Sequence, residues 1–281
     1  MSTVIYFHEV CLDGFACALT AYLKFRDTAT YIGIDYDTPI DWEQKDNTIY
    51  FIDLVPNTTS EIITRLCDRN AVTIIDHHDD CFSYPHLHAL TYIDLNRSAC
   101  SLAWEFFFPT KPIPKLFYYI EEDDIILDPS YESRAVCFNL TRFAKSFNTW
   151  LEILRLFDDH KQEAAFLKDS YYLYDRNIKL CKDIIEQTKT SVTIGKHLGI
   201  AMNVNNFAHA DVTLLTYKDY DFSMVYCICA TGRVHVTLRS DKVNVRDIAR
   251  EYHGGGVPDL ASFNMKAQTF FQTFIFEEIT K

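Results

Sequence analysis

The stretch Val72-Thr-Ile-Ile-Asp-His-His78 joins four consecutive β-branched residues to an acid and two imidazoles. A short apolar run of this kind, bounded by polar residues, is typical of a buried strand. Residues 3–7 and 48–53 are similar runs, and each also leads into a polar or acidic residue. The sequence therefore predicts three strands whose ends carry titratable side chains.

Helix-like segments separate these runs. One helix is expected from Gly14 to Phe25 and another from Ser60 to Arg69, with Thr59 or Ser60 available as the N-cap of the second. Strands that alternate with helices form parallel sheets, and such sheets bind ligands at the carboxyl ends of their strands. The polar residues expected at those ends are His8, Asp13, Asp53, Asp76, His77 and His78.

Carboxylate and imidazole groups gathered at one sheet edge are the ligands of a divalent cation. Mn²⁺ suits this mixture of oxygen and nitrogen, with Mg²⁺ and Co²⁺ as alternatives. Two such ions would each bind a phosphate oxygen, and they would lower the pKa of a water between them until it is hydroxide. In a site of that kind the nucleophile is solvent and not a side chain.

From about Asn148 onward the sequence pattern indicates first a helix and then strands. Apolar residues recur at spacings of four and three from about Asn148 to Gln187, which predicts a connecting helix. After Thr190 the expected elements are strands at 222–229 and 234–238, a helix near 245–252 and a glycine loop at 253–258. We therefore expect an α/β fold with an N-terminal parallel-sheet domain (1–150), a helical connector (151–189) and a smaller C-terminal α/β domain (190–281).

Charge and cysteine usage narrow the class of protein. The formal net charge is −12 and no run of Lys or Arg is present, which argues against a protein that coats long duplex nucleic acid. Nine Cys without paired CxxC spacing favour a reducing compartment. The first residues lack the pattern of a signal peptide, and no stretch of 18 apolar residues follows. We expect a cytoplasmic protein with no membrane partner; the oligomeric state stays open.

Six segments together resemble the DHH phosphoesterase superfamily. HEVCLDGFACA (8–18), FIDLVP (51–56) and IIDHHDDC (74–81) are similar to its motifs I to III, in the same order and spacing. YIDLNRSACSLAWEFF (92–107) and IEEDDI (120–125) resemble later motifs of its nano-RNase and cyclic-nucleotide phosphodiesterase branch. Residues 238–263 are similar to the DHH-associated C-terminal domain.

The resemblance implies a role for each matched residue. The implied metal ligands are His8, Asp13, Asp53, His77 and Asp124, with Asp123 as the alternative to Asp124. Asp53 would bridge two ions. The implied catalytic residues are Asp76, His77 and His78. Of these, Asp76 and His78 would orient ligands or hydrogen-bond the bridging water. The implied phosphate-binding residues are Arg239, Ser240, Gly254, Gly255 and Gly256, the glycines through their backbone N–H groups.

Two positions depart from the family pattern. Cys11 stands where many members have a second Asp in motif I, so it is either a softer ligand or a buried thiol. Val257 stands where the glycine loop usually continues into His-Pro, so a phosphate-contacting imidazole is missing. Both departures bear on how strongly metal and substrate bind.

The function expected from these features is hydrolysis of a phosphodiester or terminal phosphate in a small nucleotide. Short oligoribonucleotides, cyclic nucleotides and bisphosphorylated nucleosides all fit. One alternative is a pyrophosphatase or polyphosphatase, which would need a denser set of Lys and Arg. Another is a catalytically weakened nucleotide-binding module, an idea motivated by Cys11 and Val257.

Overall fold

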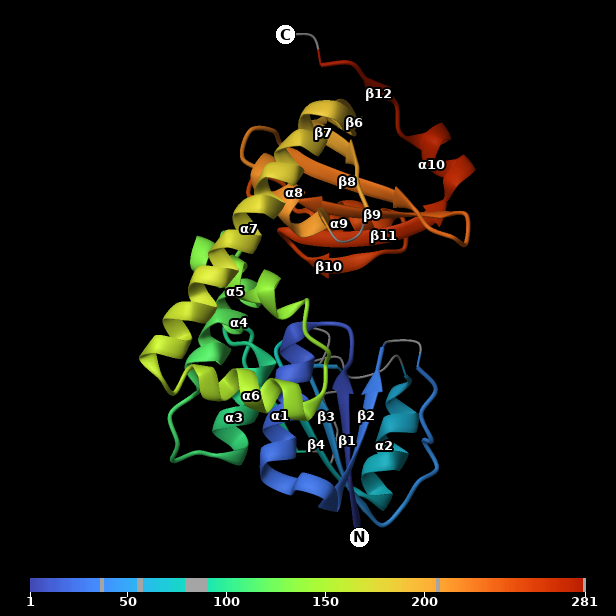
Figure 1. The fold of residues 1–281 in the computed structure, drawn as a ribbon. Coiled ribbons are helices and arrows are strands. Elements are labelled where there is room, and N and C mark those ends of the chain that lie inside the picture. Colours follow the sequence, from blue (N-terminus) through green and yellow to red (C-terminus); the bar gives the residue numbers. More distant parts are fainter. Residues whose placement is uncertain (36–37, 55–57, 79–89, 206–207, 280–281) are drawn as a thin grey trace. The chain divides into compact units, whose positions relative to one another are not determined.

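The computed structural model describes residues 1–35, 38–54, 58–78, 90–205 and 208–279. This part of the chain forms two compact units, Met1–Tyr174 and Asp175–Lys281 (Figure 1). The ends of the second and third motifs, from Val55 and from Asp79 onward, lie outside the described residues. Among the residues described, no helix combines the length and the apolar character needed to cross a membrane.

The first unit is built on a five-stranded sheet in the order β2-β1-β3-β4-β5, and every neighbouring pair is parallel. Its strands are β1 (Ser2–His8), β2 (Ala29–Ile34), β3 (Asn47–Ile52), β4 (Ala71–Asp76) and β5 (Leu90–Ile93). The parallel sheet expected from the alternation of strands and helices is confirmed. Because β1, β3 and β4 are adjacent, the three strand ends singled out in the sequence lie at one edge.

Helices cover both faces of this sheet (Figure 1). The helical elements are α1 (Leu12–Phe25), η1 (Arg26–Thr28), α2 (Ser60–Arg69), α3 (Ala99–Phe107), α4 (Lys115–Ile125), α5 (Tyr131–Leu140) and α6 (Phe147–Leu156). Helix α2 buries Ile63 and Leu66 against one face, and α1, α3, α4 and α6 pack on the other. Thr59 caps α2 by accepting a hydrogen bond from the N–H of Ile62, as an N-cap threonine should.

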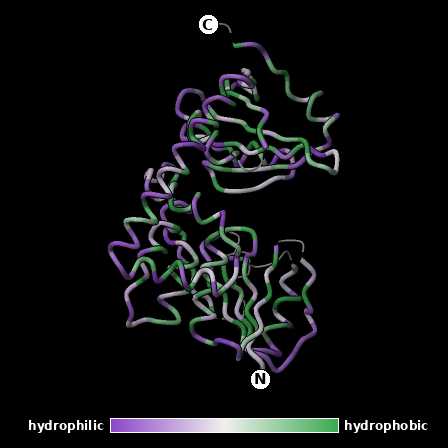
Figure 2. Tube along the Cα trace, viewed as in Figure 1, coloured by the Kyte–Doolittle hydropathy of each residue, from purple (hydrophilic) through white to green (hydrophobic). Residues whose placement is uncertain are grey.

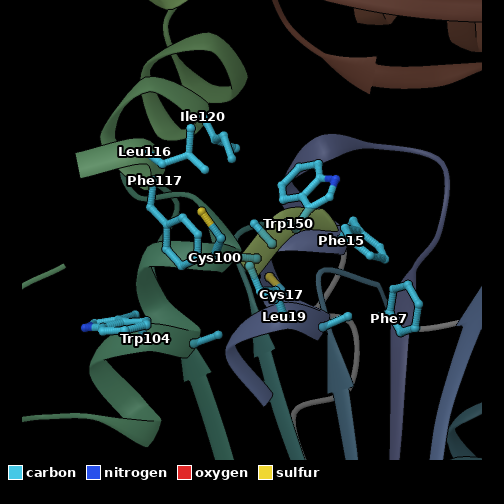
Figure 3. Packing of buried hydrophobic residues seen from close by; sticks show 14 of the residues in the cluster. Phe7, Phe15, Cys17, Leu19, Cys100, Trp104, Leu116, Phe117, Ile120 and Trp150 are labelled. Carbon is cyan, nitrogen blue, oxygen red and sulfur yellow. The ribbon is translucent and has the colours of Figure 1, made fainter. Parts of the chain in front are cut away.

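Apolar side chains gather between the sheet and its helices. Figure 2 shows that the central strands of this unit are the most hydrophobic part of its trace. In Figure 3 side chains of α1, α3, α4 and α6 meet in one cluster, where Phe15 and Trp150 pack edge to face with centroids 5.0 Å apart. Full burial of each large side chain contributes about 2–3 kcal/mol, so α1 and α6 are firmly fixed to each other.

The segment expected to be one helix from Asn148 to Gln187 is two helices. Helix α6 ends at Leu156, and α7 runs over His160–Thr188. The break has a local cause, because the Asp159 side chain accepts hydrogen bonds from the N–H groups of Lys161 and Gln162 and so starts a new helix. The division between the two compact units falls within α7, after Tyr174.

The second unit holds a seven-stranded sheet in the order β10-β11-β9-β8-β7-β6-β12. Its strands are β6 (Thr190–Ile194), β7 (His197–Asn203), β8 (Phe222–Ile228), β9 (Arg233–Arg239), β10 (Gly255–Val257), β11 (Leu260–Lys266) and β12 (Phe276–Glu277), and its helices are α8 (His209–Thr216), α9 (Val245–Glu251) and α10 (Ala267–Thr273). The pair β7–β8 is parallel and the other pairs are antiparallel. A C-terminal α/β unit is therefore confirmed.

The glycine segment expected to be a loop is partly a strand. Gly255–Val257 forms β10 and pairs antiparallel with β11. Gly256 has φ 133°, and a Cβ atom there would lie 2.4 Å from the carbonyl oxygen of Leu260. Only glycine can bring the backbone this close, so the glycine run serves the tight hairpin between β10 and β11.

Candidate metal centre

The polar strand ends meet at one edge of the parallel sheet. His8 is the last residue of β1, Asp53 follows β3, and Asp76 closes β4 with His77 next in the chain. Helix α1 contributes Asp13 from its first turn. Helix α4 contributes Asp124 from its last turn. The structure thus brings together all the metal ligands that the sequence resemblance implies.

Asp53 lies at the centre of this group, and its two oxygens face different neighbours. Oδ2 lies 3.4 Å from Nδ1 of His8 and accepts a hydrogen bond from the Cys11 thiol at 3.0 Å. Oδ1 lies 3.3 Å from Nε2 of His77. Ligand atoms of His8, Cys11 and Asp53 lie within 4.8 Å of one another, and these three residues form the first ligand group. One buried carboxylate therefore joins two potential cation sites.

The second ligand group consists of Asp13, His77 and Asp124. Nε2 of His77 lies 3.4 Å from Oδ2 of Asp124 and 3.9 Å from Oδ2 of Asp13. The N–H groups of Ala99 and Cys100, at the start of α3, each donate to Asp13 at 2.9 Å. A helix N-terminus that holds both oxygens of a carboxylate fixes its orientation and favours its charge. Asp13 is therefore oriented before any ligand arrives.

Two neighbouring acids on α4 have different partners. Both oxygens of the Asp123 carboxylate accept from Nη1 of Arg134, at 2.7 and 2.9 Å. Asp124 instead faces His77. Successive residues on a helix point about 100° apart, so the two acids reach different neighbours. This geometry separates the two candidates that the sequence left open.

Asp76 organises the pair of histidines that follows it. Its Oδ1 accepts from the N–H groups of His77 at 2.7 Å and His78 at 3.1 Å, and it contacts Nδ1 of His78 at 2.7 Å. If Nδ1 of His78 carries the proton in that contact, its Nε2 is left as an acceptor. Asp76 therefore contacts the backbone of both histidines and the ring of His78.

Charge crowding marks this cluster as a place for a cation. Burial and the charge of Asp53 raise the pKa of Asp13 to about 6. Burial opposes the protonated form of His77, but the carboxylates around it raise its pKa to about 10. Burial and the charge of Asp13 raise the pKa of Asp124 well above its usual range. Divalent cations would replace these protons, because the ligand set combines hard oxygen with imidazole nitrogen.

Asp53 departs from this trend. Burial works against its charge, but close contacts with His77 and His8 hold the pKa of its carboxyl well below its usual range. Its backbone also has φ 66°, which is uncommon for a residue with a side chain and is often tolerated by Asp and Asn. The surrounding structure thus holds an ionised Asp53 in a conformation with some strain, which is a feature of functional sites.

Gly14 permits the close approach of these groups. A Cβ atom at this position would lie 2.1 Å from the carbonyl oxygen of His8 and 2.9 Å from Oδ2 of Asp53. We therefore expect Gly14→Ala to push α1 away from β1, to lower the unfolding free energy by roughly 2–3 kcal/mol, and to abolish metal binding. The three tryptophans (Trp42, Trp104 and Trp150) all lie in the first unit, so their fluorescence follows its unfolding.

Gly33→Ala is the matched control for that change. The nearest atoms to the added carbon would be Cδ, Cγ and Cβ of Glu9, at 2.9–3.0 Å. Glu9 is exposed, so its outer carbons can turn aside and its Cβ must shift only slightly, whereas a backbone oxygen blocks the change at Gly14. Gly33→Ala should therefore lower the stability clearly less than Gly14→Ala does. Equal unfolding midpoints for Gly14→Ala and the wild type would contradict the close packing of α1 on β1.

Cys11 occupies the N-cap of α1. Its Sγ accepts from the N–H of Gly14 at 3.0 Å and donates to Oδ2 of Asp53. Burial and the charge of Asp53 raise the pKa of the thiol well above its usual range, so it is a neutral donor in the absence of metal. Cys11 is part of the first ligand group, so a carboxylate at position 11 would be an additional metal ligand there.

Cys11→Asp is expected to tighten Mn²⁺ binding by about tenfold while lowering the melting temperature of the metal-free protein. A carboxylate is a hard ligand, but without a cation it would repel Asp53. Cys11→Ser keeps a capping oxygen without charge and is the control, with unchanged affinity expected. Isothermal titration and thermal melts measure both effects. A lower melting temperature with unchanged affinity would show that position 11 does not reach the ion.

Sequence reasoning missed Asp35, which follows β2. Its Oδ1 lies 3.9 Å from Nε2 of His8, whereas Asp53 lies near the other ring nitrogen, Nδ1. A carboxylate on the second nitrogen of a ligating histidine sets the orientation of the ring. The available signal was similar to that of the other strands, because the segment 29–34, with three β-branched residues and a tyrosine, is also followed by an acid.

The predicted phosphate-binding residues lie together in the second unit. Arg239 ends β9, is buried, and pairs in register with Leu260 of β11. The Ser240 hydroxyl donates to the carbonyl of Asp221 and accepts from the N–H groups of Lys242 and Val243. These bonds use its full donor and acceptor capacity within the protein.

The glycine N–H groups are not equally available. The N–H of Gly254 donates to the carbonyl oxygen of Ala249 at 2.9 Å and ends α9. Its predicted contribution to an anion nest would require this bond to break. Gly255 has open space beside its Cα, since nothing lies within 4 Å of an added Cβ. Of the three glycines, Gly255 alone has this space beside its Cα, because an added Cβ at Gly254 or Gly256 would meet backbone atoms of β11.

A row of polar side chains on β9 and β11 was also missed. Nδ1 of His235 contacts Oδ1 of Asn264 at 3.1 Å, and Ser262 donates to the hydroxyl of Thr237 at 3.2 Å. His209 of α8 stacks on His235 with ring centroids 5.6 Å apart. Burial lowers the pKa of His209 to about 4, so this ring is neutral. The signal in the sequence was alternation, because polar residues occupy every second position of β9.

No established protein-family model matches this sequence. It is 24% identical over 285 residues to an uncharacterized protein of Acanthamoeba polyphaga mimivirus. That match covers 90% of this chain and 65% of the mimivirus protein, so the chain spans just under two thirds of the length of this curated relative.

Solved structures with a similar fold include the DHH domain of a protein from a family of ribosomal proteins. It superposes with a TM-score of 0.61 and 10% identity, over 98% of this chain and 83% of that one. An exopolyphosphatase-related protein from Bacteroides fragilis gives 0.52 and 13%, over 94% and 86%. At these identities the likeness establishes the fold, and the chain has the α/β fold of DHH-domain proteins.

Proposed function

We propose that this protein is a metal-dependent phosphoesterase that hydrolyses a phosphodiester or terminal phosphate of a small nucleotide. The observation that carries the proposal is the position of Asp53. Its Oδ2 faces His8 and its Oδ1 faces His77, so one carboxylate joins two ligand groups. Two cations held by a shared carboxylate are the arrangement that in-line displacement at phosphorus uses.

Bound divalent ions would supply Lewis-acid stabilisation of the phosphate and a hydroxide nucleophile near neutral pH. The residues of the chain hold the ligand atoms in place for that chemistry. Asp13 is fixed by the N–H groups of α3, and Asp124 reaches the same group from α4. A mixture of carboxylate and imidazole suits Mn²⁺, with Mg²⁺ and Co²⁺ as alternatives.

The pair Asp76–His78 is suited to proton transfer at this site. Asp76 Oδ1 holds Nδ1 of His78 at 2.7 Å, which sets the ring orientation and leaves Nε2 for another partner. The side chain of His78 is 34% exposed, whereas that of His77 is 11% exposed. We assign to His78 the role of contacting the reacting water or the leaving oxygen, and to His77 that of a metal ligand.

The second unit favours a nucleotide over an inorganic substrate. The polar row on β9 and β11 mixes Arg239 and Arg233 with hydroxyl, amide and imidazole groups, instead of a dense set of Lys and Arg. Highly charged polyphosphates favour the denser arrangement. The net charge of −12 further supports a short substrate over long nucleic acid.

A Mn²⁺-supplemented substrate screen tests the proposal. The panel is a 5′-phosphorylated dinucleotide, a cyclic mononucleotide, a 3′,5′-bisphosphorylated nucleoside, and pyrophosphate, each with the full chain. Turnover of a nucleotide with Mn²⁺ and none with EDTA is expected. Turnover of pyrophosphate alone would replace the proposal with the pyrophosphatase alternative. Binding of Mn²⁺ and nucleotide without turnover of any member would make the protein a nucleotide-binding module.

A further inference from the structure

Lys145 contacts the loop that carries one of the two ligand groups. Its Nζ donates to the carbonyl oxygen of Glu9 at 2.6 Å and to that of Cys11 at 3.0 Å. These residues form the turn between β1 and α1, so His8 lies immediately before the contact and Asp13 shortly after it. A single ammonium group thus ties together a short loop from more than 130 positions away in the sequence.

The support that carries Lys145 is rigid. The residue lies just before Ser146, the N-cap of α6. The first residue of this helix, Phe147, stacks on Tyr22 with centroids 4.3 Å apart and on Phe15 at 5.7 Å. Both partners belong to α1. The position of the ammonium relative to the loop is therefore set by aromatic packing on the same helix that holds Asp13. Desolvation lowers the pKa of Lys145, as expected for an amine whose partners are neutral carbonyl groups.

We propose that Lys145 is a positioning residue for the first ligand group. By holding the carbonyls of Glu9 and Cys11, it fixes the turn in which the Cys11 side chain and His8 both face Oδ2 of Asp53. The inference rests on the proposed function for the identity of the ligand, a divalent cation. The contacts themselves exist in the protein without any ion.

Two effects of this lysine on metal binding have opposite signs. As a positive charge near a dication it disfavours binding, by about fivefold for a site open to water. As the support of a ligand-bearing loop it favours binding, and loss of such orienting contacts costs about 10- to 100-fold in affinity. If Mn²⁺ binds more weakly after the lysine charge is removed, Lys145 is a positioning residue. If Mn²⁺ binds more tightly, Lys145 acts only through its charge.

The test compares Lys145→Met with Lys145→Arg in the full chain stripped of metal. Methionine has a similar length and shape but neither charge nor donors, whereas arginine keeps both. Titration calorimetry with Mn²⁺ should show one of two affinities weakened about 10- to 100-fold in Lys145→Met and restored to within about threefold in Lys145→Arg. Lys111→Met is the control for charge alone, because Lys111 lies over the ring of Phe108 and not at this loop.

A second measurement needs no metal. Hydrogen exchange of the amides from Glu9 to Gly14 should accelerate at least tenfold in metal-free Lys145→Met, with the strands β3 and β4 unchanged. Tighter or unaltered Mn²⁺ binding in Lys145→Met, or unchanged exchange in the loop, would overturn the inference. If the wild type binds no Mn²⁺, the proposed function fails, and the exchange result still decides whether Lys145 holds the loop.

Discussion

Asp53→Asn is expected to lower the turnover number of the Mn²⁺-loaded protein on its phosphodiester substrate by roughly a thousandfold, which corresponds to about 4 kcal/mol of transition-state stabilisation. Asparagine keeps the size of the side chain and tolerates the φ of 66° at this position. Asparagine lacks the charge and the second acceptor oxygen, so it cannot supply one oxygen to the first ligand group and another to the second.

The metal content of the variant is part of the expected result. Titration calorimetry and elemental analysis should find at most one Mn²⁺ per chain in Asp53→Asn where the wild type holds two. Asp94→Asn is the matched control, because Asp94 follows β5 at the same edge of the sheet and caps its own turn by accepting from the N–H of Asn96. A variant at position 53 that retains a tenth of wild-type turnover with two ions bound would remove the shared-carboxylate mechanism.

The strands and their polar ends could be predicted because both depend on short stretches of sequence. Runs such as 48–53 indicate a buried strand through their β-branched residues, and parallel connectivity then brings Asp53 and His77 to one edge. The same reasoning applies to Asp35, although no strand was predicted at 29–34. Local patterns therefore predict which sheet edge carries the chemistry.

Contacts between distant segments could not be predicted in this way. The choice between Asp123 and Asp124 depends on how α4 is rotated. That rotation is set by the packing of its buried face, including Leu116 and Phe117, in the core, and it places Asp123 against Arg134. Lys145 reaches Glu9 only because aromatic packing fixes α6 on α1. Nothing in the residues around position 145 signals such a contact.

The charge states of the acids could not be predicted from the sequence either. Adjacent carboxylates suggest mutual repulsion, and Asp13 shows it, with a pKa raised to about 6. Asp53 behaves oppositely, because His77 and His8 contact its two oxygens and hold its pKa low. Substituting Asp53 therefore removes favourable contacts from the metal-free protein, whereas substituting Asp124 relieves crowding. Only the positions of the imidazoles decide between these outcomes.

Those charge states lead to the second large effect: as the pH rises, the stability of the metal-free protein should fall and the stabilisation that Mn²⁺ adds should grow. The carboxylates around it raise the pKa of His77 to about 10, and contact with Asp76 raises that of His78 to about 9, in both cases against the effect of burial. A histidine whose pKa is higher in the folded state stabilises the fold fully below its unfolded pKa, about 6.5. That stabilisation is lost as pH rises through the folded value.

The metal-free first unit should therefore become less stable between pH 6.5 and pH 9, by about 2 kcal/mol after allowance for the coupling of these groups. Asp13 adds a loss of the same sign between about pH 4 and 6, because its proton is also held more tightly in the folded state. Binding of Mn²⁺ displaces these protons, so its affinity should grow as the pH rises. At roughly a thousandfold excess over its dissociation constant, the metal should stabilise the unit by about 4 kcal/mol.

Tryptophan fluorescence melts at pH 6.5, 7.5 and 8.5, with EDTA or with Mn²⁺, measure both slopes on the first unit alone. The melting temperature in EDTA should fall with pH, and the increment produced by Mn²⁺ should rise to roughly 10 °C at the highest pH. His77→Gln should flatten the EDTA series and remove most of the increment, because it eliminates the ring on which three carboxylates converge. Asp94→Asn should retain both slopes. An increment that is the same at every pH would mean that Mn²⁺ binds without displacing the protons of this cluster, and the assignment of His77 as a ligand would fail.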